Sequence, residues 1–239
     1  MAAILIYGPS GYGKTTAISP PGGPKLPPEK TFVICIDSKP LPFPGWELDY
    51  KKGRNYIEEK DPVKVLDGLK KIEASGKFEY VVLDSLTHTM MKMFMDEAHR
   101  KDWDKWTEFA KKTYDIYNYV QSMTANVVCI NHEEDVNTPS GVKQTRVRTM
   151  GKLLDEKVEI PSMFTYVFFP TVKYKDKKAK YSFQTQSNGT TMAKTPYGMF
   201  PFEIDNNYKK IFDRIDAYGK DAKSMMAKPK QADSASDKV

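Results

Sequence analysis

A glycine-rich segment follows directly on a short apolar run at the start of the chain. The run is Ala3–Tyr7, and the segment after it reads Gly8-Pro9-Ser10-Gly11-Tyr12-Gly13-Lys14-Thr15-Thr16. The spacing G-x-x-x-x-G-K-[ST], placed between a strand and a helix, is that of a loop that cradles nucleotide phosphates. This context constrains the fold, because the loop needs a buried strand before it and a helix after it. We therefore expect Gly8–Thr16 to bind a nucleotide, with a helix opening at Lys14–Ile18.

Each part of this loop has a physical task. Glycines let the backbone curl, so that successive N–H groups point at phosphate oxygens, and the helix N-terminus adds its positive end. Lys14 is expected to reach the β- and γ-phosphates, and the Thr15 hydroxyl is expected to bind Mg²⁺. ATP and Mg²⁺ are therefore the expected cofactors. The prolines of Ser19–Lys30 are expected to form a surface loop that ends the first helix early.

Three more apolar runs of strand length follow, and longer amphipathic stretches separate them. The runs are Thr31–Ile36, Glu79–Asp84 and Asn126–Asn131, and the helical candidates are Asp61–Ser75, Ser85–Arg100 and Lys105–Met123. Continuous apolarity suits strands that are buried on both faces of a parallel sheet. The order predicts an α/β fold with a mainly parallel central sheet flanked by helices.

The pattern of apolar runs changes after Pro161. Three short runs read as strands separated by turns, which predicts an antiparallel C-terminal extension of the same sheet; they are Met163–Pro170, Tyr181–Gln186 and Thr191–Lys194. Asn206–Tyr218 is the expected closing helix. We expect one domain over residues 1–218 and a disordered tail over residues 219–239, because the tail has almost no large apolar side chains.

Polar side chains follow three of the predicted strands. Asp84 ends the third strand, at the edge where ligands of open α/β sheets bind, and is expected to hold Mg²⁺ together with Thr15. Asp37 follows the second strand and is the candidate general base for hydrolysis. Asn131 and His132 follow the fourth strand, where either could contact the γ-phosphate. For Asp37 and His132 the alternatives, a solvated loop acid and a surface histidine, stay open.

Composition excludes several other classes of protein. Two cysteines and three histidines in 239 residues exclude a disulfide scaffold and a four-cysteine zinc site. The longest apolar runs have strand length, and the N-terminus lacks the layout of a signal peptide, so we expect a cytoplasmic protein without a membrane partner. The net charge of +6 permits nucleic acid as a partner.

The strand-ending motifs resemble those of the RecA-like P-loop ATPases. Ile36-Asp37-Ser38-Lys39 lies where that group ends its second strand, Val82-Leu83-Asp84-Ser85 lies at its Mg²⁺ aspartate, and Asn131-His132 lies at its γ-phosphate sensor. The chain is also similar to phage-encoded ATPases of this group, including the single-strand annealing proteins related to RecA. The stretches that carry this closer similarity are Lys39–Phe43, Asn131–Glu134, Leu154–Lys157 and Phe183–Gln186.

The resemblance implies a RecA-like ATPase that acts on single-stranded DNA in recombination or annealing. It implies a homo-oligomer, either a ring or a filament, in the host cytoplasm if the chain is phage-encoded, with a single-strand binding protein as a further candidate partner. One residue departs from the pattern, because Lys39 stands where RecA proteins usually carry a catalytic glutamate. Asp37 would substitute for it, and we expect hydrolysis to be slow.

In RecA-like proteins the loop after the fourth strand contacts single-stranded DNA. The matching stretch, Asp135–Lys152, is expected to be a mobile loop whose cations track the DNA backbone; they are Lys143, Arg146, Arg148 and Lys152. Two other features have simpler interpretations. The lysines of Lys173–Lys180 are more typical of a solubilising turn, and Trp103 and Trp106 are more typical of helix packing than of base stacking.

Two other classes of function stay open. Lys39 at the glutamate position favours a nucleotide-gated adaptor, such as a helicase loader, with little catalysis. A small-molecule phosphotransferase is disfavoured, because such enzymes clamp phosphates with several arginines. The arginines of this chain form no obvious lid cluster; they are Arg54, Arg100, Arg146, Arg148 and Arg214.

Overall fold

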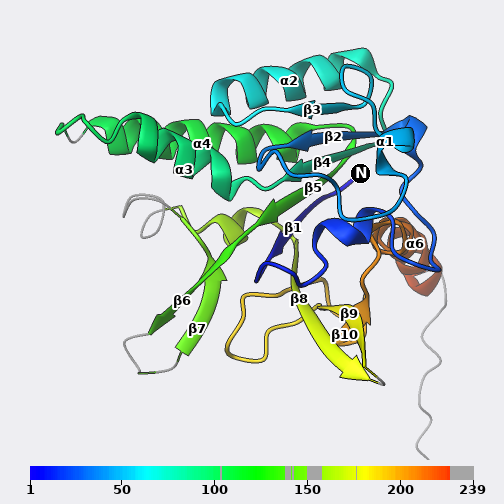
Figure 1. Ribbon diagram of the computed structural model, residues 1–239. Coiled ribbons are helices and arrows are strands. Elements are labelled where there is room, and N and C mark those ends of the chain that lie inside the picture. Colours follow the sequence, from blue (N-terminus) through cyan, green and yellow to red (C-terminus); the bar gives the residue numbers. More distant parts are fainter. Residues whose placement is uncertain (103, 138–140, 142, 150–157, 176, 227–239) are drawn as a thin grey trace, which may run out of the picture.

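The computed structural model describes residues 1–102, 104–137, 141, 143–149, 158–175 and 177–226 (Figure 1). Within these residues an eight-stranded sheet has the order β10-β9-β8-β1-β5-β4-β2-β3. Its strands are β1 (Ala3–Tyr7), β2 (Thr31–Cys35), β3 (Tyr56–Glu58), β4 (Tyr80–Asp84), β5 (Asn126–Asn131), β8 (Tyr166–Lys175), β9 (Lys178–Gln184) and β10 (Glu203–Asp205).

The sheet has the expected fold class. The pairs β8–β1, β1–β5, β5–β4, β4–β2 and β2–β3 are parallel, whereas β9 and β10 are antiparallel additions at the C-terminal side. The short strands β3 and β10 were not expected from the sequence. The expected strand Thr191–Lys194 does not form, because this segment makes only isolated bridges, from Thr191 to Thr145 and from Lys194 to Val167.

The register of the parallel strands aligns their carboxyl ends. Tyr7 at the end of β1 lies opposite Asn131 at the end of β5, and Cys35 at the end of β2 lies opposite Asp84 at the end of β4. The segments that leave these strands therefore emerge at one edge of the sheet, where parallel α/β sheets bind ligands.

Helices cover the two faces of the sheet. They are η1 (Thr15–Ile18), η2 (Pro28–Lys30), α1 (Trp46–Asp49), α2 (Pro62–Ser75), α3 (Thr87–Asp96), α4 (Asp104–Ser122), η3 (Ile160–Met163) and α6 (Tyr208–Met226). On one face Leu5 packs with α2 and α4, and on the other Ile4 packs with η1 and α6. Adjacent residues of a strand point to opposite faces, so one continuous apolar run serves both cores.

The helix ends follow local chemistry. Asp61 caps α2, because its Oδ1 accepts hydrogen bonds from the N–H groups of Val63 and Lys64. The helix after the glycine loop is a single 3-10 turn, η1, and the proline-rich segment follows it as expected. The last helix is longer than expected, because α6 continues past Tyr218 to Met226. Residues 219–226 thus continue α6, and residues 227–239 of the expected tail lie outside the described part of the chain.

The segment after β5 is a hairpin and not the expected loop. Strands β6 (Glu133–Asn137) and β7 (Lys143–Val147) form a separate two-stranded antiparallel sheet. Cross-strand ion pairs join them, from Lys143 to Asp135 at 2.8 Å and from Arg146 to Glu134 at 3.6 Å. These alternating charges favour pairing of the two segments, which composition alone had suggested to be mobile.

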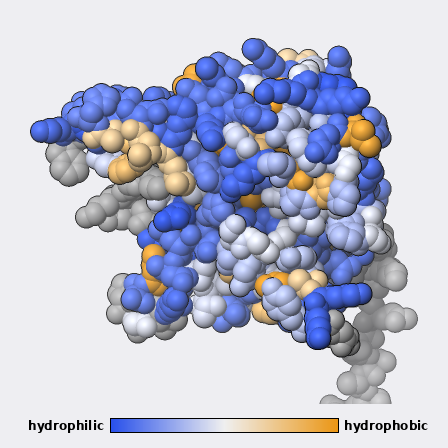
Figure 2. All heavy atoms as spheres, in the orientation of Figure 1, coloured by the Kyte–Doolittle hydropathy of each residue, from blue (hydrophilic) through white to orange (hydrophobic). Residues whose placement is uncertain are grey.

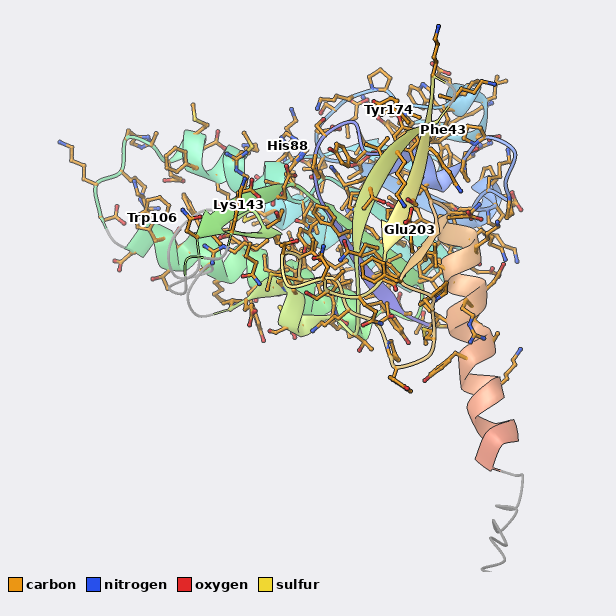
Figure 3. The ribbon with its side chains drawn as sticks, turned by 90° about the horizontal axis from the view of Figure 1, so that it is seen from below. Phe43, His88, Trp106, Lys143, Tyr174 and Glu203 are labelled. Atoms are coloured by element: carbon orange, nitrogen blue, oxygen red, sulfur yellow. The ribbon has the colours of Figure 1, made fainter. Side chains whose placement is uncertain are left out.

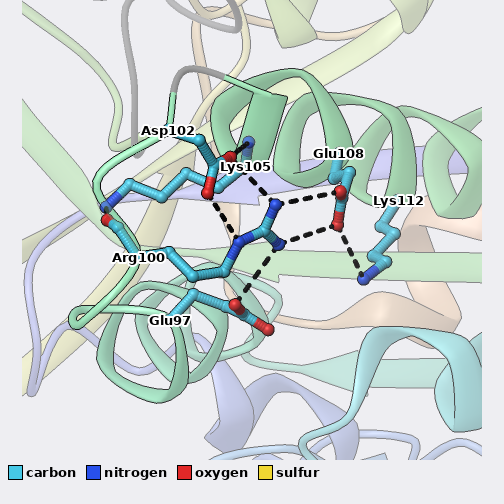
Figure 4. A network of polar contacts seen from close by, with 6 residues as sticks. All are labelled: Glu97, Arg100, Asp102, Lys105, Glu108 and Lys112. Atoms are coloured by element: carbon cyan, nitrogen blue, oxygen red, sulfur yellow. Dashed lines mark hydrogen bonds and ion pairs between the residues drawn. The ribbon is translucent and has the colours of Figure 1, made fainter.

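The helices α3 and α4 project together from the body of the protein (Figure 1). Arg100, in the connection between them, is held by the carboxylates of Glu97, Asp102 and Glu108 (Figure 4). On α3 the side chains of Met91, Phe94 and Met95 are 38%, 39% and 68% exposed. Figure 2 shows a pale orange area on this arm. Among the helices that the structure describes, none is long and apolar enough to cross a membrane.

Candidate nucleotide-binding site

The glycine loop turns back over the end of β1 and encloses the ammonium group of Lys14. Lys14 is only 7% exposed, and its Nζ donates hydrogen bonds to the carbonyl oxygens of Gly8 at 2.5 Å and Pro9 at 2.7 Å. Burial lowers the pKa of Lys14 to about 8, while the carboxylates of Glu133 and Asp84 act in the opposite direction. The cation is thus held at the position where phosphates would enter the loop.

Thr15 and Asp84 form the second part of the site. The Thr15 hydroxyl donates a 2.6 Å hydrogen bond to Oδ2 of Asp84. Asp84 is 6% exposed, and burial raises its pKa to about 6. A hydroxyl and a carboxylate beside a phosphate loop match the ligands with which proteins hold Mg²⁺, one or two oxygens completed by substrate phosphates and water. Thr15 and Asp84 therefore fit the metal that the loop implies.

The antiparallel strands support the loop from outside. A Cβ atom on Gly13 would lie 2.9 Å from Cγ of Tyr181 in β9, and one on Gly8 would lie 2.5 Å from Cγ of Pro170 in β8. Gly13 also has a φ of +77°. These glycines are required both by the curl of the loop and by the strands packed against it.

Sequence reasoning missed two tyrosines of this site. Tyr181 packs on Gly13, and the hydroxyl of Tyr208 at the start of α6 donates a 2.6 Å hydrogen bond to the carbonyl oxygen of Lys14. Both residues lie in segments expected to be a strand and a helix. No local signal in those segments points to the loop, because the contacts exist only once the sheet is complete.

Asp37 faces the same cavity as the loop, but its carboxylate is already engaged. Oδ1 accepts a hydrogen bond of 3.2 Å from the backbone N–H of Lys39, and Oδ2 pairs with the Lys39 ammonium at 3.3 Å. The thiol of Cys35 is a further donor to Oδ1 at 3.3 Å, and burial raises the pKa of that thiol to about 11. The candidate general base thus lines the same cavity as the glycine loop and is restrained by Lys39.

His132 lines the cavity and contacts a second histidine. Its ring meets the ring of His88 edge to face, with centroids 5.4 Å apart. Burial and the nearby Lys14 lower the pKa of His132 to about 4, and burial also lowers the pKa of His88. Asn131, the other candidate sensor, is fully buried, and its Oδ1 accepts a hydrogen bond from Tyr117. Asn131 does not line the cavity, and its role as a sensor stays a prediction.

One cavity of about 450 Å³ joins most of the residues expected to form the site. Lys14, Thr15, Asp37, Asp84 and His132 all line it. The other residues around it are Ser10, Gly11, Gly13, Thr16, Lys39, Pro40, Pro42, Ser85 and Tyr181. The remaining loop residues, Gly8, Pro9 and Tyr12, carry the backbone around this cavity without lining it.

Of the expected nucleic-acid residues, Lys143 and Arg146 lie on β7 and Arg148 follows it directly, next to the site in the chain. The N–H of Arg148 donates a 2.9 Å hydrogen bond to the carbonyl oxygen of His132. Figure 3 shows Lys143 on the side of the molecule that carries His88 and Trp106, away from Tyr174. Lys152 and the stretch Leu154–Lys157 lie outside the described residues.

The tryptophan interpretation concerns the α3–α4 arm. Trp106 packs against Phe94 and Phe109, with ring centroids 5.9 and 5.7 Å apart. These contacts agree with the helix-packing interpretation of this tryptophan. Trp103 lies outside the described residues.

Comparisons with known proteins show which family this chain belongs to. Residues 1–197 match the model of a family described as AAA domain. Among solved structures, the chain is similar to the crystal structure of the KaiC-like protein PH0186 from the hyperthermophilic archaeon Pyrococcus horikoshii OT3. The identity is 11% and the TM-score 0.45, over 79% of this chain and 80% of that chain. The search of the curated proteins found no match. Because the family match spans most of its length, this chain belongs to the AAA domain family of P-loop ATPases.

Proposed function

We propose that this protein binds ATP with Mg²⁺, hydrolyses it slowly, and acts on single-stranded DNA in recombination or strand annealing. The observation that carries the proposal is the cavity in which Lys14, Thr15 and Asp84 meet at the end of β1 and β4. The resemblance to phage-encoded RecA-like ATPases supplies the expectation of DNA as the substrate.

Each residue of the cavity has its own proposed role in phosphoryl transfer. The loop N–H groups and Lys14 would bind the phosphates, and Thr15 with Asp84 would hold Mg²⁺, which neutralises charge on the β- and γ-phosphate oxygens. Asp37 would accept a proton from the attacking water, which requires that its carboxylate leave Lys39. The ion pair between Asp37 and Lys39 at 3.3 Å therefore supports slow hydrolysis.

The position of the hairpin supports coupling between nucleotide and DNA. The backbone bond from Arg148 to His132 joins the residue that follows β7 to the backbone of a residue that lines the phosphate cavity. Lys143 and Arg146 are paired with Asp135 and Glu134, so DNA phosphates would have to compete with these carboxylates. We therefore expect DNA binding to be moderate and strongly dependent on salt.

The α3–α4 arm supports a homo-oligomer. Met91, Phe94 and Met95 expose apolar surface on one projecting helix. Contiguous exposed apolar surface is a common mark of protein–protein contact. A second copy of the chain is the partner that a ring or filament would supply.

A nucleotide-gated adaptor is the second candidate function. The pair between Asp37 and Lys39 favours it as well, because a restrained base is compatible with a protein that binds ATP and seldom cleaves it. The phosphotransferase is disfavoured, since Arg100 is held by three carboxylates of its own arm.

ATP turnover measured with and without single-stranded DNA tests the proposal. We expect Mg²⁺-dependent turnover that rises when an oligonucleotide is added, with Lys14→Ala as the inactive control. A rate of ATP turnover that does not change with DNA and rises only with a protein partner would support the adaptor instead. Turnover that needs a small phosphate acceptor would support the phosphotransferase.

A further inference from the structure

The turn that follows β2 holds Lys39 at the wall of the phosphate cavity. Ser38, between Asp37 and Lys39, has a φ of +58°, a left-handed conformation that is uncommon for residues with a side chain. The N–H of Lys39 donates a 3.2 Å hydrogen bond to Oδ1 of Asp37, and the Cys35 thiol donates to the carbonyl oxygen of Lys39 at 3.3 Å. These contacts fix the backbone of Lys39 in a turn whose side chain lines the cavity.

The side chain of Lys39 is less constrained than its backbone. It is 64% exposed, and its ammonium pairs with Oδ2 of Asp37 at 3.3 Å. No other partner of this ammonium lies in the part of the chain that the structure describes. An ammonium carries three donors on a flexible four-carbon stem. Lys39 can therefore exchange the carboxylate of Asp37 for another anion that enters the cavity.

The charge of Lys39 acts on the groups around the space for phosphates. Burial is the main cause of the lowered pKa of His132, about 4, and the charges of Lys14, His88 and Lys39 act in the same direction. Burial also lowers the pKa of Lys14 to about 8, and the charge of Lys39 adds to that effect. The ammonium of Lys39 is thus close enough to influence both the enclosed lysine of the loop and the histidine that follows β5.

Phosphoryl transfer requires positive charge at the outer oxygens of the γ-phosphate, where negative charge is spread in the transition state, and many P-loop enzymes place an arginine there. Among the described residues that line this cavity there is no arginine, and Lys39 is the one lysine besides Lys14. The ammonium of Lys14 already donates to two carbonyl oxygens of the loop. Lys39 is therefore the cation left for the outer end of a triphosphate.

We infer that the ammonium of Lys39 binds the γ-phosphate of ATP and thereby frees the carboxylate of Asp37 as the general base. The inference rests on the proposed binding and hydrolysis of ATP in this cavity. Without a γ-phosphate, Lys39 pairs with Asp37, as the structure shows. ADP leaves that pair intact, because it lacks the phosphate for which Lys39 would exchange its partner. The substrate itself thus releases the base that acts on it.

The chemical step then balances as follows. The oxygen of a water molecule attacks the γ-phosphorus, and the bond from this phosphorus to the β–γ bridging oxygen breaks with its electron pair kept by ADP. The carboxylate of Asp37 takes one proton of the water, and the other proton stays on the inorganic phosphate. Lys39 keeps its protons and offsets the negative charge on the phosphoryl oxygens. Asp37 then loses its proton to the solvent and pairs again with Lys39.

Calorimetric titration of full-length wild type and Lys39→Ala, with a non-hydrolysable ATP analogue and with ADP, tests the contact. We expect the variant to bind the analogue about tenfold more weakly, the worth of one charged hydrogen bond, and to bind ADP as the wild type does. Unchanged affinity for ADP also shows that the variant is folded. A purely structural role for Lys39 would weaken the binding of both nucleotides alike.

ATP turnover separates a γ-phosphate ligand from a simple restraint on the base. If Lys39 only restrained Asp37, Lys39→Ala would hydrolyse ATP faster than the wild type. We expect instead that the variant's turnover at saturating ATP falls by about tenfold or more, because the transition state loses a cation. Lys39→Arg should restore part of the rate, since it keeps the charge with a different geometry.

Lys30→Ala is the matched control. Lys30 stands before the other end of β2, where its ammonium pairs with Glu79 at 2.6 Å, and it does not line the cavity. This variant should match the wild type in both affinities and in turnover. If the wild type binds no nucleotide or shows no Mg²⁺-dependent turnover, the proposed function fails. If it does both, and Lys39→Ala keeps the wild-type ratio of the two affinities or turns over ATP faster, only the inference about Lys39 is overturned.

Discussion

The hydroxyl of Thr15 donates a 2.6 Å hydrogen bond to Oδ2 of Asp84, although the two residues are 69 positions apart in the chain. The contact exists because β1 and β4 end at the same edge of the sheet, with β5 between them. It joins the glycine loop to the carboxylate that is expected to hold Mg²⁺.

Asp84→Asn should remove a pH dependence of stability. Burial raises the pKa of Asp84 to about 6, so between pH 4 and 6 the folded state keeps a proton that the unfolded state releases. The free energy of unfolding of the wild type should therefore fall as pH rises through this window. Without metal at pH 7.5 the variant should be more stable by about 1–3 kcal/mol. Urea denaturation at pH 4.5 and 7.5 measures this, and parallel pH profiles for the two proteins would contradict it.

The same variant should lose the effect of Mg²⁺ on turnover. Asparagine keeps the shape of aspartate but lacks the charge that helps to hold a divalent cation. We expect metal-free nucleotide binding to be retained and Mg²⁺-dependent hydrolysis to disappear. Normal turnover would place the metal carboxylate elsewhere, and Asp37 is the first alternative.

Lys14→Ala should weaken ATP binding by about 100-fold or more, because it would remove the charged hydrogen bonds that we expect Lys14 to make to the β- and γ-phosphates. The fold should persist, since the core packs on strand and helix side chains and not on this lysine. Lys39→Ala is the matched control, a lysine that lines the same cavity with its side chain 64% exposed. Equal losses of affinity in the two variants would show that the loss comes from removing any positive charge of the cavity, and not from the enclosed position of Lys14.

Gly13→Ala should be far more damaging to stability than Gly11→Ala. Both glycines have positive φ, +77° and +81°, so both variants strain the backbone by about 1–2 kcal/mol. Only at Gly13 does the new methyl group meet a neighbour, Tyr181 at 2.9 Å, whereas nothing lies within 4 Å at Gly11. Thermal unfolding measures the difference, and Tyr181→Ala should restore part of it in the double variant. Equal loss in both single variants would show that strain alone matters.

Replacing Lys143, Arg146 and Arg148 with alanine should weaken single-stranded DNA binding and leave ATP binding unchanged. Each lost phosphate contact flattens the slope of log affinity against log salt by roughly 0.7, so three contacts give about 2 units. Asp135→Asn should do the opposite, because it frees Lys143 from its 2.8 Å ion pair. Fluorescence anisotropy over a salt series measures both. If the triple variant keeps the affinity and slope of the wild type, the basic hairpin tip at Lys173–Lys180 becomes the leading candidate.

The central strands could be predicted because buried parallel strands are continuous apolar runs. The strands β1 and β5 have the expected bounds, and the Asp61 cap of α2 is encoded by adjacent residues. The three-residue strands β3 and β10 could not be predicted, since so short a segment shows no periodicity. The charge pairs of the β6–β7 hairpin were also missed, because pairing across a hairpin depends on register and not on composition.

The sequence by itself determined the glycine loop, its strand and the strand-ending aspartate, because each depends on the spacing of neighbouring residues. Only the tertiary structure decided which side chains complete the site. Tyr181 reaches Gly13 from β9, and Tyr208 reaches Lys14 from α6. Burial of Asn131 against α4 left His132 as the side chain at the cavity. These outcomes depend on the order and register of strands far apart in the chain, and no local pattern encodes them.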